Sequence, residues 1–580
     1  MKSWEHIYEK WNSFRDLEPD LKTQLAKLKD DPIALEDAFY KELTFGTGGM
    51  RGVIGPGINR MNVYTIRKAV DGLANYLLEN TVNVRDRGVV IAYDSRHMSK
   101  EFALETAKVL GAYGIAAYVF SSLRPTPLLS FAVRYLGTVA GVMITASHNP
   151  PEYNGFKVYN EDGGQITPSQ ASDIITYINQ TEDELTVPVI EKAELEEKEL
   201  LIWIKDEVDN AYLQRLLQIS KLPSTEIAKE KNMPVVFTPL HGTAYELVPQ
   251  GLKQLNFKKV HMVKEQAIPD PEFSTVASPN PEEHQAFALA IEKGKQTDAV
   301  ILLATDPDAD RLGVAVKNKA GEYQVLTGNQ LGALMFDYIL SHSDLNLLKS
   351  GRMLKTVVTS ELGKAVADYY GIKTVNTLTG FKFIGEKIRQ FDSTGESFVF
   401  GYEESYGYLI SSFVRDKDAV QASMMACEMA YYWHKQGKTL LDVLDDLFAR
   451  HGYYFEGMDS LTLKGKRGSE QITAIMDYIR KEPMHKIGGL RVEQVEDYLV
   501  RTRKCLHDEK QTEPIELPKE NMVKFILEQA CWVCLRPSGT EPKLKCYYGV
   551  RGNSEAESRE KLAALQATMN QVLKQILETE

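Results

Sequence analysis

Short apolar runs alternate with segments of helical periodicity along most of this chain, and this alternation constrains the fold more than any other feature. Runs of four to six apolar residues, set between helical stretches, are typical of strands in a sheet that helices cover on both faces. The helical spacing is clearest at 100–110. The runs lie at 88–93, 117–120, 139–144, 234–239, 299–304, 353–358 and 397–400. We therefore predict an α/β protein.

The chain has 580 residues, which is enough for three to five domains. Residues 1–40 have helical spacing. The stretch 181–205 is dense in Glu and Lys and indicates a solvated helix or a domain junction. The α/β pattern starts again after it, changes near residue 326, and gives way near residue 453 to polar helices. We predict four domains, at 1–205, 206–325, 326–452 and 453–580.

The formal net charge is −12, with 43% apolar and 26% charged residues. Such a composition is ordinary for a soluble globular protein. A strongly acidic chain lacks the basic face that broad nucleic-acid binding requires. An anionic ligand would have to meet a local cluster of Lys and Arg, because the overall field repels it.

Five cysteines are spread through the second half of the chain: Cys427, Cys505, Cys531, Cys534 and Cys546. A sparse, odd set in a long chain is typical of reduced thiols in the cytosol. Cys531 and Cys534 form a C-x-x-C without a second pair, inside a run that indicates a strand. The first residues are polar, and no apolar run reaches the ~18 residues of a membrane span. We expect a cytoplasmic protein.

The first loop with chemical potential is Thr145-Ala-Ser-His-Asn-Pro-Pro151, which directly follows an apolar run. A sharp, proline-terminated turn can present the hydroxyl of Ser147 from the end of a sheet. Ser, Asn and Pro also favour ordinary turns, so this loop alone leaves both interpretations open. The loop lacks the G-x-S-x-G pattern of a hydrolase nucleophile elbow.

Three carboxylates alternate in Asp306-Pro-Asp-Ala-Asp-Arg311, which also follows an apolar run. In an extended strand Asp306 and Asp310 would lie ~13 Å apart, too far for short side chains to share one Mg²⁺. The loop must therefore curl if it binds a cation. A calcium-binding EF-hand loop would have Gly and Glu where this sequence has Arg311 and Lys317. A solvated acidic turn stays open as the alternative.

Two further loops carry polar groups that suit different ligands. Gly401-Tyr-Glu-Glu-Ser-Tyr-Gly407 places carboxylates and a hydroxyl on a glycine-bounded turn, which suits neighbouring sugar hydroxyls. Arg536-Pro-Ser-Gly-Thr-Glu-Pro-Lys543 combines a guanidinium, two hydroxyls and backbone N–H groups, which together can hold a phosphate dianion. It is not a Walker A loop, because G-x-x-x-x-G-K-[ST] is absent. Neither loop identifies a ligand by itself.

In this order, and together with Thr44-Phe-Gly-Thr-Gly-Gly-Met-Arg-Gly52, the four loops resemble the α-D-phosphohexomutase superfamily and its long phosphoglucomutase and phosphopentomutase branch. The resemblance implies four domains round a central cleft. Three would be related α/β domains with a mixed sheet between helices, and the C-terminal one a smaller α+β domain. In chain order the domains would hold the phosphoserine, metal-binding, sugar-binding and phosphate-binding loops.

The resemblance also implies roles for single residues. Ser147 would carry the phosphoryl group. Asp306, Asp308 and Asp310 would bind Mg²⁺, and an oxygen on Ser147 would complete that set. Lys157, in Asn154-Gly-Phe-Lys157, would be the general acid/base. His148 is a rival base that we expect to orient the nucleophile. Arg311 would line the cleft. The residues implied to bind substrate are Arg51, Thr379, Gly380, Lys382, Glu403, Ser405, Arg536, Ser538, Gly539 and Thr540.

The implied reaction is that of an isomerase-class phosphoglucomutase, which interconverts α-D-glucose 1-phosphate and glucose 6-phosphate through a phosphoserine. Mg²⁺ would be the cofactor, and glucose 1,6-bisphosphate the intermediate and activator. Phosphopentomutase and phosphomannomutase activities, with the same machinery, are the alternatives. The intact loops argue against a non-catalytic sugar-phosphate sensor and against a metal-dependent phosphatase. We expect a small sugar phosphate as partner, not nucleic acid or membrane, and a monomer or weak dimer.

Overall fold

The computed structural model describes residues 3–46, 48–463, 465–482, 484–506, 512–538 and 543–579. The chain divides into two compact units. The first comprises Met1–Gly328, Phe381–Gly401 and Ser405–Gly437. The second comprises Asn329–Gly380, Tyr402–Glu404 and Lys438–Glu580.

The first unit contains a six-stranded sheet in the order β1-β5-β4-β2-β3-β6. Its strands are β1 (Gly49–Val53), β2 (Val89–Tyr93), β3 (Ala117–Phe120), β4 (Ala140–Ile144), β5 (Tyr153–Asn160) and β6 (Leu201–Ile204). β2, β3, β4 and β6 run parallel, whereas β5 pairs antiparallel with β4 and β1. β2 and β4 are buried along their whole length, which explains their unbroken apolar sequences. In the β4–β5 pair, Met143 lies opposite Lys157.

Helices cover this sheet: α4 (Val63–Asn80), α5 (Val84–Arg87), α6 (Ser99–Ala112), α7 (Thr126–Leu136), α8 (Pro168–Ile178) and α9 (Lys192–Glu197). The longest, α4, begins at a capping box in which Asn62 and Thr65 satisfy each other's backbone N–H groups. Gly72 in α4 permits close packing of α8, because a Cβ there would lie 2.4 Å from Cγ1 of Ile178.

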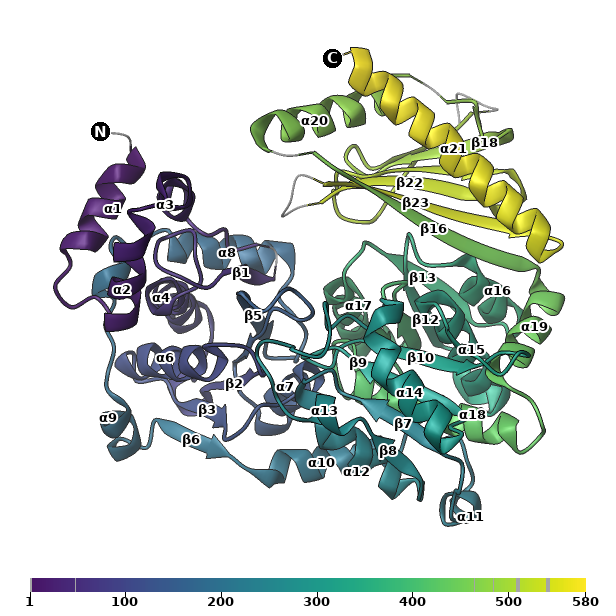
Figure 1. Cartoon of the computed structure of the whole chain (residues 1–580), viewed down its shortest axis with the longest axis horizontal. Coiled ribbons are helices and arrows are strands. Elements are labelled where there is room, and N and C mark those ends of the chain that lie inside the picture. Colours follow the sequence, from purple (N-terminus) through teal and green to yellow (C-terminus); the bar gives the residue numbers. More distant parts are fainter. Residues whose placement is uncertain are drawn as a thin grey trace. The chain divides into compact units, whose positions relative to one another are not determined.

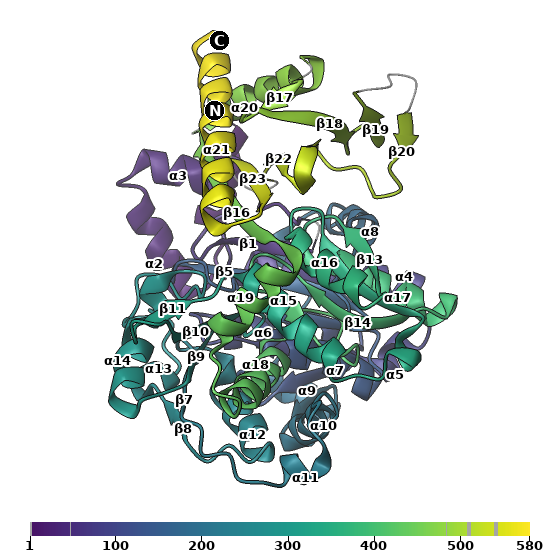
Figure 2. The ribbon, with the colours of Figure 1, turned by 90° about the vertical axis from the view of Figure 1, so that its right-hand side faces the viewer.

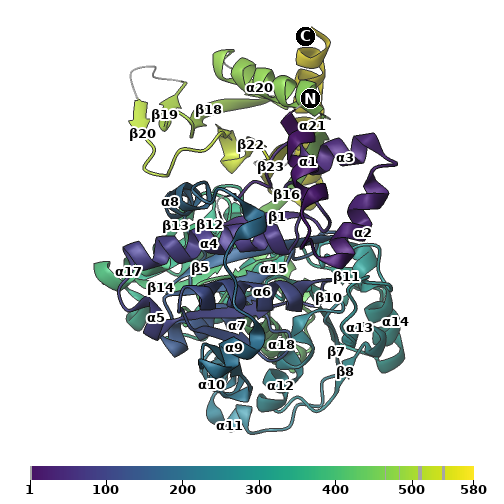
Figure 3. The ribbon, with the colours of Figure 1, turned by 90° about the vertical axis from the view of Figure 1, so that its left-hand side faces the viewer.

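Three N-terminal helices precede the sheet: α1 (Ser3–Ser13), α2 (Pro19–Leu28) and α3 (Pro32–Phe39). They form a small group beside α4 (Figure 3) and confirm the helical prediction for residues 1–40. Trp11 anchors them, since it is fully buried and packs edge-on against Phe39 and Tyr64. Its Nε1–H donates to Oε1 of Glu184 at 2.7 Å, so α1 is tied to the far end of the same domain.

Trp11→Phe is expected to lower the free energy of unfolding by about 1–3 kcal/mol, because buried Glu184 loses a charge-assisted hydrogen bond and the smaller phenyl ring fills less of the buried site. Urea denaturation followed by far-UV circular dichroism measures the change. A loss below about 0.5 kcal/mol, the range of ordinary surface substitutions, would contradict this account of the anchor.

The second sheet of the first unit has five strands in the order β11-β10-β9-β7-β8. They are β7 (Val235–Thr238), β8 (Val260–Met262), β9 (Ile301–Thr305), β10 (Leu312–Lys317) and β11 (Tyr323–Val325). β7, β8 and β9 are parallel, and β10 turns back antiparallel to β9. The helices of this region are α10 (Asp206–Leu217), α11 (Ser224–Ile227), α12 (Leu247–Gln254), α13 (Lys264–Ala267) and α14 (Ala288–Thr297).

A third α/β segment runs from 328 to 451. It contains α15 (Gly328–Ser341), β12 (Gly351–Thr356), α16 (Glu361–Tyr369), β13 (Lys373–Thr377), α17 (Phe381–Thr394), β14 (Ser397–Tyr402), β15 (Tyr408–Leu409), α18 (Ala419–His434) and α19 (Leu440–His451). β12 and β13 pair in parallel within the second unit. The strand–helix alternation confirms the α/β prediction here as well.

The last part of the second unit is a largely antiparallel sheet in the order β16-β23-β22-β21-β18-β19-β20. The strands are β16 (Tyr453–Thr462), β17 (Lys486–Ile487), β18 (Leu490–Asp497), β19 (Thr502–Cys505), β20 (Thr512–Pro514), β21 (Val523–Leu527), β22 (Trp532–Pro537) and β23 (Lys543–Gly552). Helix α21 (Glu555–Thr579) runs along β16 and β23, with α20 (Gly465–Lys481) beside it (Figures 1 and 2). This is the predicted α+β domain.

Two smaller expectations concern the cysteines and the stretch 181–205. The run with the C-x-x-C is strand β22, and Cys531 and Cys534 are buried free thiols, as predicted. The Glu- and Lys-rich stretch 181–205 holds the short helix α9, but it ends in β6, which completes the first sheet.

Within the described residues, no helix has both the length and the apolar character that crossing a bilayer requires.

Candidate active site

Ser147 lies in the connection between the antiparallel strands β4 and β5, at the carboxyl end of β4. Its side chain is buried, and its φ angle of 52° falls in the left-handed region that non-glycine residues rarely adopt. The hydroxyl of Thr145 accepts the backbone N–H of Ser147 at 2.8 Å and helps to hold this turn. A strained residue that its surroundings fix in place is common at functional sites.

The Ser147 hydroxyl meets two groups. Its Oγ donates to Oδ2 of Asp306 at 2.7 Å, and Nδ1 of His148 lies 3.1 Å from the same oxygen. Asp306 follows β9 in the second sheet, 159 residues further along the chain. The fold therefore brings together two loops that the sequence shows only as separate strand ends.

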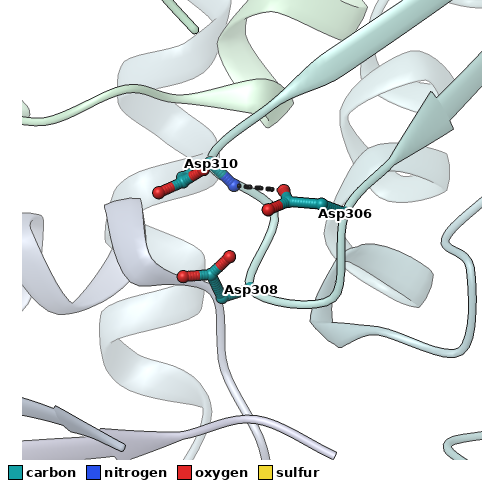
Figure 4. A group of neighbouring side chains, drawn as sticks. All are labelled: Asp306, Asp308 and Asp310. Atoms are coloured by element: carbon teal, nitrogen blue, oxygen red, sulfur yellow. Dashed lines mark hydrogen bonds between the residues drawn. The ribbon is translucent and has the colours of Figure 1, made fainter. Parts of the chain in front are cut away.

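The acidic loop is curled, as its sequence requires for a shared cation. Oδ1 of Asp306 accepts the backbone N–H groups of Asp310 at 3.0 Å and Arg311 at 2.9 Å, which draws the loop back on itself (Figure 4). Ala309 takes a positive φ of 54° at the bend. One carboxylate oxygen from each of Asp306, Asp308 and Asp310 lies within 4.8 Å of the others.

Neighbouring segments hold this loop from outside. Gly242, after β7, leaves no room for a Cβ, which would lie 2.4 Å from Cα of Pro307. Thr243 donates its N–H and its hydroxyl to the carbonyl of Pro307 at 2.8 and 3.0 Å. Thr126, at the start of α7, donates its N–H to the carbonyl of Asp308 and its hydroxyl to the Asp308 carboxylate. No pattern in the sequence indicated these three residues.

The donor set fits a hard divalent cation. Within the described part of the chain, Oδ1 of Asp308 and Oδ1 of Asp310 are buried and have no hydrogen-bond partner. Burial, together with the charges of Asp308 and Asp310, raises the pKa of Asp306 well above its ordinary value. Three such carboxylates stay ionised together only beside positive charge, and oxygen ligands of this kind suit Mg²⁺.

Two lysines border the acidic cluster. Nζ of Lys157, on β5, lies 2.8 Å from Oδ2 of Asp308 and 3.7 Å from Oδ2 of Asp310. Nζ of Lys417 lies 3.0 Å from Oδ2 of Asp310. Although burial opposes the ionisation of Asp308, these lysines hold its pKa below its ordinary value. Lys417 was not predicted, and the charged run just before buried helix α18 was the signal for it.

The surroundings of His148 favour the neutral form of its imidazole. Burial, followed by the positive charges of Arg311 and Arg51, lowers its pKa well below the ordinary value for histidine, although Asp308 acts in the opposite direction. A neutral imidazole beside Ser147 Oγ can accept the hydroxyl hydrogen. The geometry is compatible both with an orienting role and with proton transfer.

Arg51 and Arg311, the two arginines predicted to line the cleft, both lie at this site. Arg51, on β1, donates from Nη1 to Oδ1 of Asn149 in the serine loop at 2.8 Å. Arg311 follows the acidic loop, and its Nη1 donates to the carbonyl of Ser405 at 2.9 Å and pairs with Glu282. Ser405, a predicted sugar contact, therefore lies against the first unit's acidic loop.

The other predicted sugar-binding residues divide between the units. In the second unit, buried Glu403 accepts the N–H of Gly380 through Oε1 at 2.8 Å, which links two predicted binding loops. Thr379 Oγ1 is buried without a hydrogen-bond partner among the described residues. Lys382 belongs to the first unit, at the start of α17, with its Nζ 5.3 Å from the centre of the Phe383 ring.

The predicted phosphate clamp begins at the end of β22. Nε of Arg536 donates to Oε1 of Glu520 at 3.1 Å, and the N–H of Ser538 donates to the carbonyl of Lys543 at 2.7 Å. The second of these bonds joins the two described ends of the loop, Ser538 and Lys543. Gly539 and Thr540 lie outside the described residues.

Fold and sequence together define the class of the protein. Four family models match successive parts of the chain: phosphoglucomutase/phosphomannomutase alpha/beta/alpha domain I at residues 42–185, domain II at 210–321, domain III at 327–451, and the C-terminal domain at 488–571. The chain belongs to the phosphoglucomutase/phosphomannomutase family, within the α-D-phosphohexomutase superfamily. This confirms three α/β domains followed by a smaller C-terminal domain.

Its curated relatives include phosphoglucomutases at high coverage. The chain is 40% identical over 523 residues to that of Staphylococcus aureus strain MRSA252, covering 90% of this chain and 91% of the relative. It is 39% identical over 539 residues to that of Staphylococcus haemolyticus strain JCSC1435, covering 91% and 96%.

Two solved structures share the fold. One is a phosphoglucomutase/phosphomannomutase family protein from Burkholderia thailandensis, with 20% identity, a TM-score of 0.66 and coverage of 92% of this chain and 97% of that one. The other is the open form of pp63/parafusin, a phosphoglucomutase from Paramecium, with 18% identity, a TM-score of 0.68 and coverage of 93% and 96%. At these identities the likeness concerns the fold alone.

Proposed function

We propose that this protein is a phosphoglucomutase that interconverts α-D-glucose 1-phosphate and glucose 6-phosphate. The observation that carries the proposal is the 2.7 Å contact between Ser147 Oγ and Asp306, inside a cluster of three carboxylates and two lysines. The names of the curated relatives support glucose as the sugar.

In the proposed reaction Ser147 stores the migrating phosphoryl group. Phosphoserine transfers it to the free 6-hydroxyl of glucose 1-phosphate, which yields glucose 1,6-bisphosphate and unmodified Ser147. The bisphosphate then turns round, and Ser147 attacks its 1-phosphate and releases glucose 6-phosphate. Each transfer breaks one P–O bond and forms another; the accepting hydroxyl gives up one proton, and the oxygen that leaves phosphorus takes one up.

Asp306, Asp308 and Asp310 would hold Mg²⁺, with an oxygen on Ser147 as a further ligand. When bound, the cation neutralises the phosphoryl charge and polarises the group for in-line transfer. Arg311, directly after the acidic loop, adds positive charge on the protein side. Lys417 keeps Asp310 in place through its ion pair.

The proton is proposed to move through Lys157, with His148 orienting Ser147. Lys157 pairs with Asp308 at 2.8 Å, and its ammonium group must leave this ion pair and lose a proton before the amine can accept one from the attacking hydroxyl. Lys157→Met is expected to lower kcat about 10²–10³-fold, and His148→Asn only about tenfold. Saturating substrate and Mg²⁺ isolate kcat in both assays. A larger loss for the His148 variant would exchange the two roles.

Other predicted residues are proposed to bind the parts of the substrate that do not react. Glu403 and Ser405 would contact sugar hydroxyls, and Thr379, with its buried hydroxyl, would join them. Arg51, Gly380 and Lys382 would also contact substrate. The unreacting phosphate would be held by Arg536, Ser538, Gly539 and Thr540. Because the bisphosphate must bind in two orientations, contacts near the middle of the ring suit a mutase better than a kinase.

A substrate panel tests the function. The purified protein would receive glucose 1-phosphate, mannose 1-phosphate or ribose 1-phosphate with Mg²⁺ and a trace of the corresponding bisphosphate. We expect kcat/KM for glucose 1-phosphate to exceed the others by at least ~10-fold. Preference for ribose or mannose would assign a phosphopentomutase or a phosphomannomutase. Absence of turnover on all three would reject the mutase.

We further propose that the protein works in the cytoplasm as a monomer or weak dimer. Size-exclusion chromatography with light scattering, over a range of protein concentrations, tests the oligomeric state. A concentration-independent tetramer would contradict this part of the proposal.

A further inference from the structure

The guanidinium of Arg96 is hydrogen-bonded to the backbone of the loop that carries Ser147. Its Nη2 donates to the carbonyls of Ser147, at 2.7 Å, and Asn149. Its Nη1 donates to the carbonyls of Pro150 at 2.8 Å and Tyr153 at 3.0 Å. A single side chain therefore binds four carbonyl groups within one seven-residue segment. The rigid fork of a guanidinium can do this, whereas an ammonium cannot.

The guanidinium is itself fixed on its other sides. The Arg96 side chain is fully buried, with Nε 3.5 Å from Oδ2 of buried Asp94. Oδ1 of Asp94 accepts the N–H of Arg96 and the hydroxyl of Ser99, so the carboxylate cannot swing away. Arg96 and its carboxylate are thus built into the carboxyl end of β2, next to β4 in the sheet.

Phe273, from the part of the chain that forms the second sheet, packs against the remaining face of the Arg96 guanidinium. The Phe273 ring centre lies 4.9 Å from Cζ of Arg96, and Phe273 is 1% exposed with a positive φ of 50°. The adjacent residue Glu272 pairs with His97. Phe273 belongs to the same region as the acidic loop, so Arg96 joins the two segments that supply Ser147 and Asp306.

We infer that Arg96 is a positioning residue for phosphoryl transfer: it fixes the carbonyl of Ser147, and so aims Oγ at the acidic cluster. The inference rests on the proposed mutase function. Ser147 needs such a restraint, because its left-handed backbone would otherwise relax toward a common conformation. Arg96 binds backbone carbonyls and no reacting atom, so its loss should change the rate of transfer more than the binding of the sugar.

The test compares Arg96→Ala with Arg67→Ala. Arg67 is a matched control, since it is half-buried, pairs with buried Glu105, and has its Cζ 5.0 Å from the centre of the Tyr64 ring. Arg96→Ala is expected to lower kcat about 100-fold, the cost of a displacement near 1 Å, while KM changes less than about threefold. Added guanidinium ion should restore part of kcat, and methylammonium should not. Arg67→Ala should keep its kcat and show no response to either cation.

A second readout does not depend on turnover. Intact-mass spectrometry follows how fast glucose 1,6-bisphosphate phosphorylates dephosphorylated protein, and Arg96→Ala should be slowed as much as kcat. If this variant fails to fold, Arg96→Lys serves instead, because it keeps the charge but cannot reach all four carbonyls. Its kcat should fall about tenfold, with a melting temperature close to wild type.

The outcomes separate the two proposals. If the wild type shows no mutase turnover, the proposed function fails. If the wild type turns over and either Arg96 variant keeps its kcat, only the positioning role fails. The positioning role also fails if Arg96→Ala and Arg67→Ala lose kcat equally and guanidinium restores neither. General destabilisation would then explain both losses.

Discussion

Ser147→Ala is expected to lose mutase turnover by at least ~10⁴-fold, because the variant has no group to store the migrating phosphoryl. Binding should survive, since the predicted sugar and phosphate contacts come from other residues. A coupled assay with glucose 6-phosphate dehydrogenase measures turnover, and calorimetry measures the affinity for glucose 1-phosphate. Wild-type protein should carry one phosphate on the Ser147 peptide, and the variant none.

Ser423→Ala is the matched control for this experiment. Ser423 is a fully buried serine of α18 whose Oγ has no hydrogen-bond partner among the described residues. Its loss should leave turnover and phosphate content unchanged. Near-normal turnover in Ser147→Ala would overturn the mechanism, even if binding behaved as expected.

Asp306→Asn is the second substitution with a large expected effect, and it should separate activity from stability. Turnover should fall about 10²–10³-fold, as for the loss of one electrostatic stabiliser of the transition state. The affinity for Mg²⁺ should fall too. Asparagine can still accept the N–H groups of Asp310 and Arg311 through Oδ1, so the loop should stay curled.

The stability of Asp306→Asn, unlike its turnover, should equal or exceed that of the wild type when the metal is chelated. The folded protein raises the pKa of Asp306 above its value in the unfolded chain, so ionised Asp306 lowers the stability at neutral pH. Asparagine removes that cost. In EDTA, therefore, Asp306→Asn should unfold at the same urea concentration as wild type or a higher one. Glu105→Gln, which breaks the partly buried ion pair with Arg67, should lose stability and keep its turnover.

A destabilised Asp306→Asn with full activity would contradict both halves of this prediction. Magnesium titrations of turnover, with and without a large excess of metal, distinguish weaker binding from a slower chemical step. Partial recovery at high Mg²⁺ is expected, because Asp308 and Asp310 are unchanged.

The strand ends that carry the site could be predicted from the sequence for a physical reason. Buried strands such as β4 and β9 are unbroken apolar runs, so the polar loops after them stand out. The curl of the acidic loop also followed from the reach of three aspartates. The resemblance to a known superfamily, however, was needed to assign Ser147 and Asp306 to one site. Spacing along the chain carries no information about a contact across 159 residues.

Residues that hold the site from other segments were missed for the same reason. Thr126 binds Asp308 and Lys417 binds Asp310, yet neither lies near the acidic loop in sequence. Arg96 follows a predicted strand, but its partners are backbone carbonyls, which leave no trace in residue types. The edge strand β6 was hidden by the acidic helix before it, because local charge dominated the interpretation of 181–205.

The pairing of β4 with β5 constrains the number of residues between Ser147 and Lys157. Since Met143 faces Lys157 across this antiparallel ladder, the loop that carries Ser147 also fixes the register of β5. Inserting or deleting one residue there would transfer Lys157 to the opposite side of the sheet, away from the aspartates. Indels in this connection should therefore be tolerated far less than point substitutions, although the segment is formally a loop.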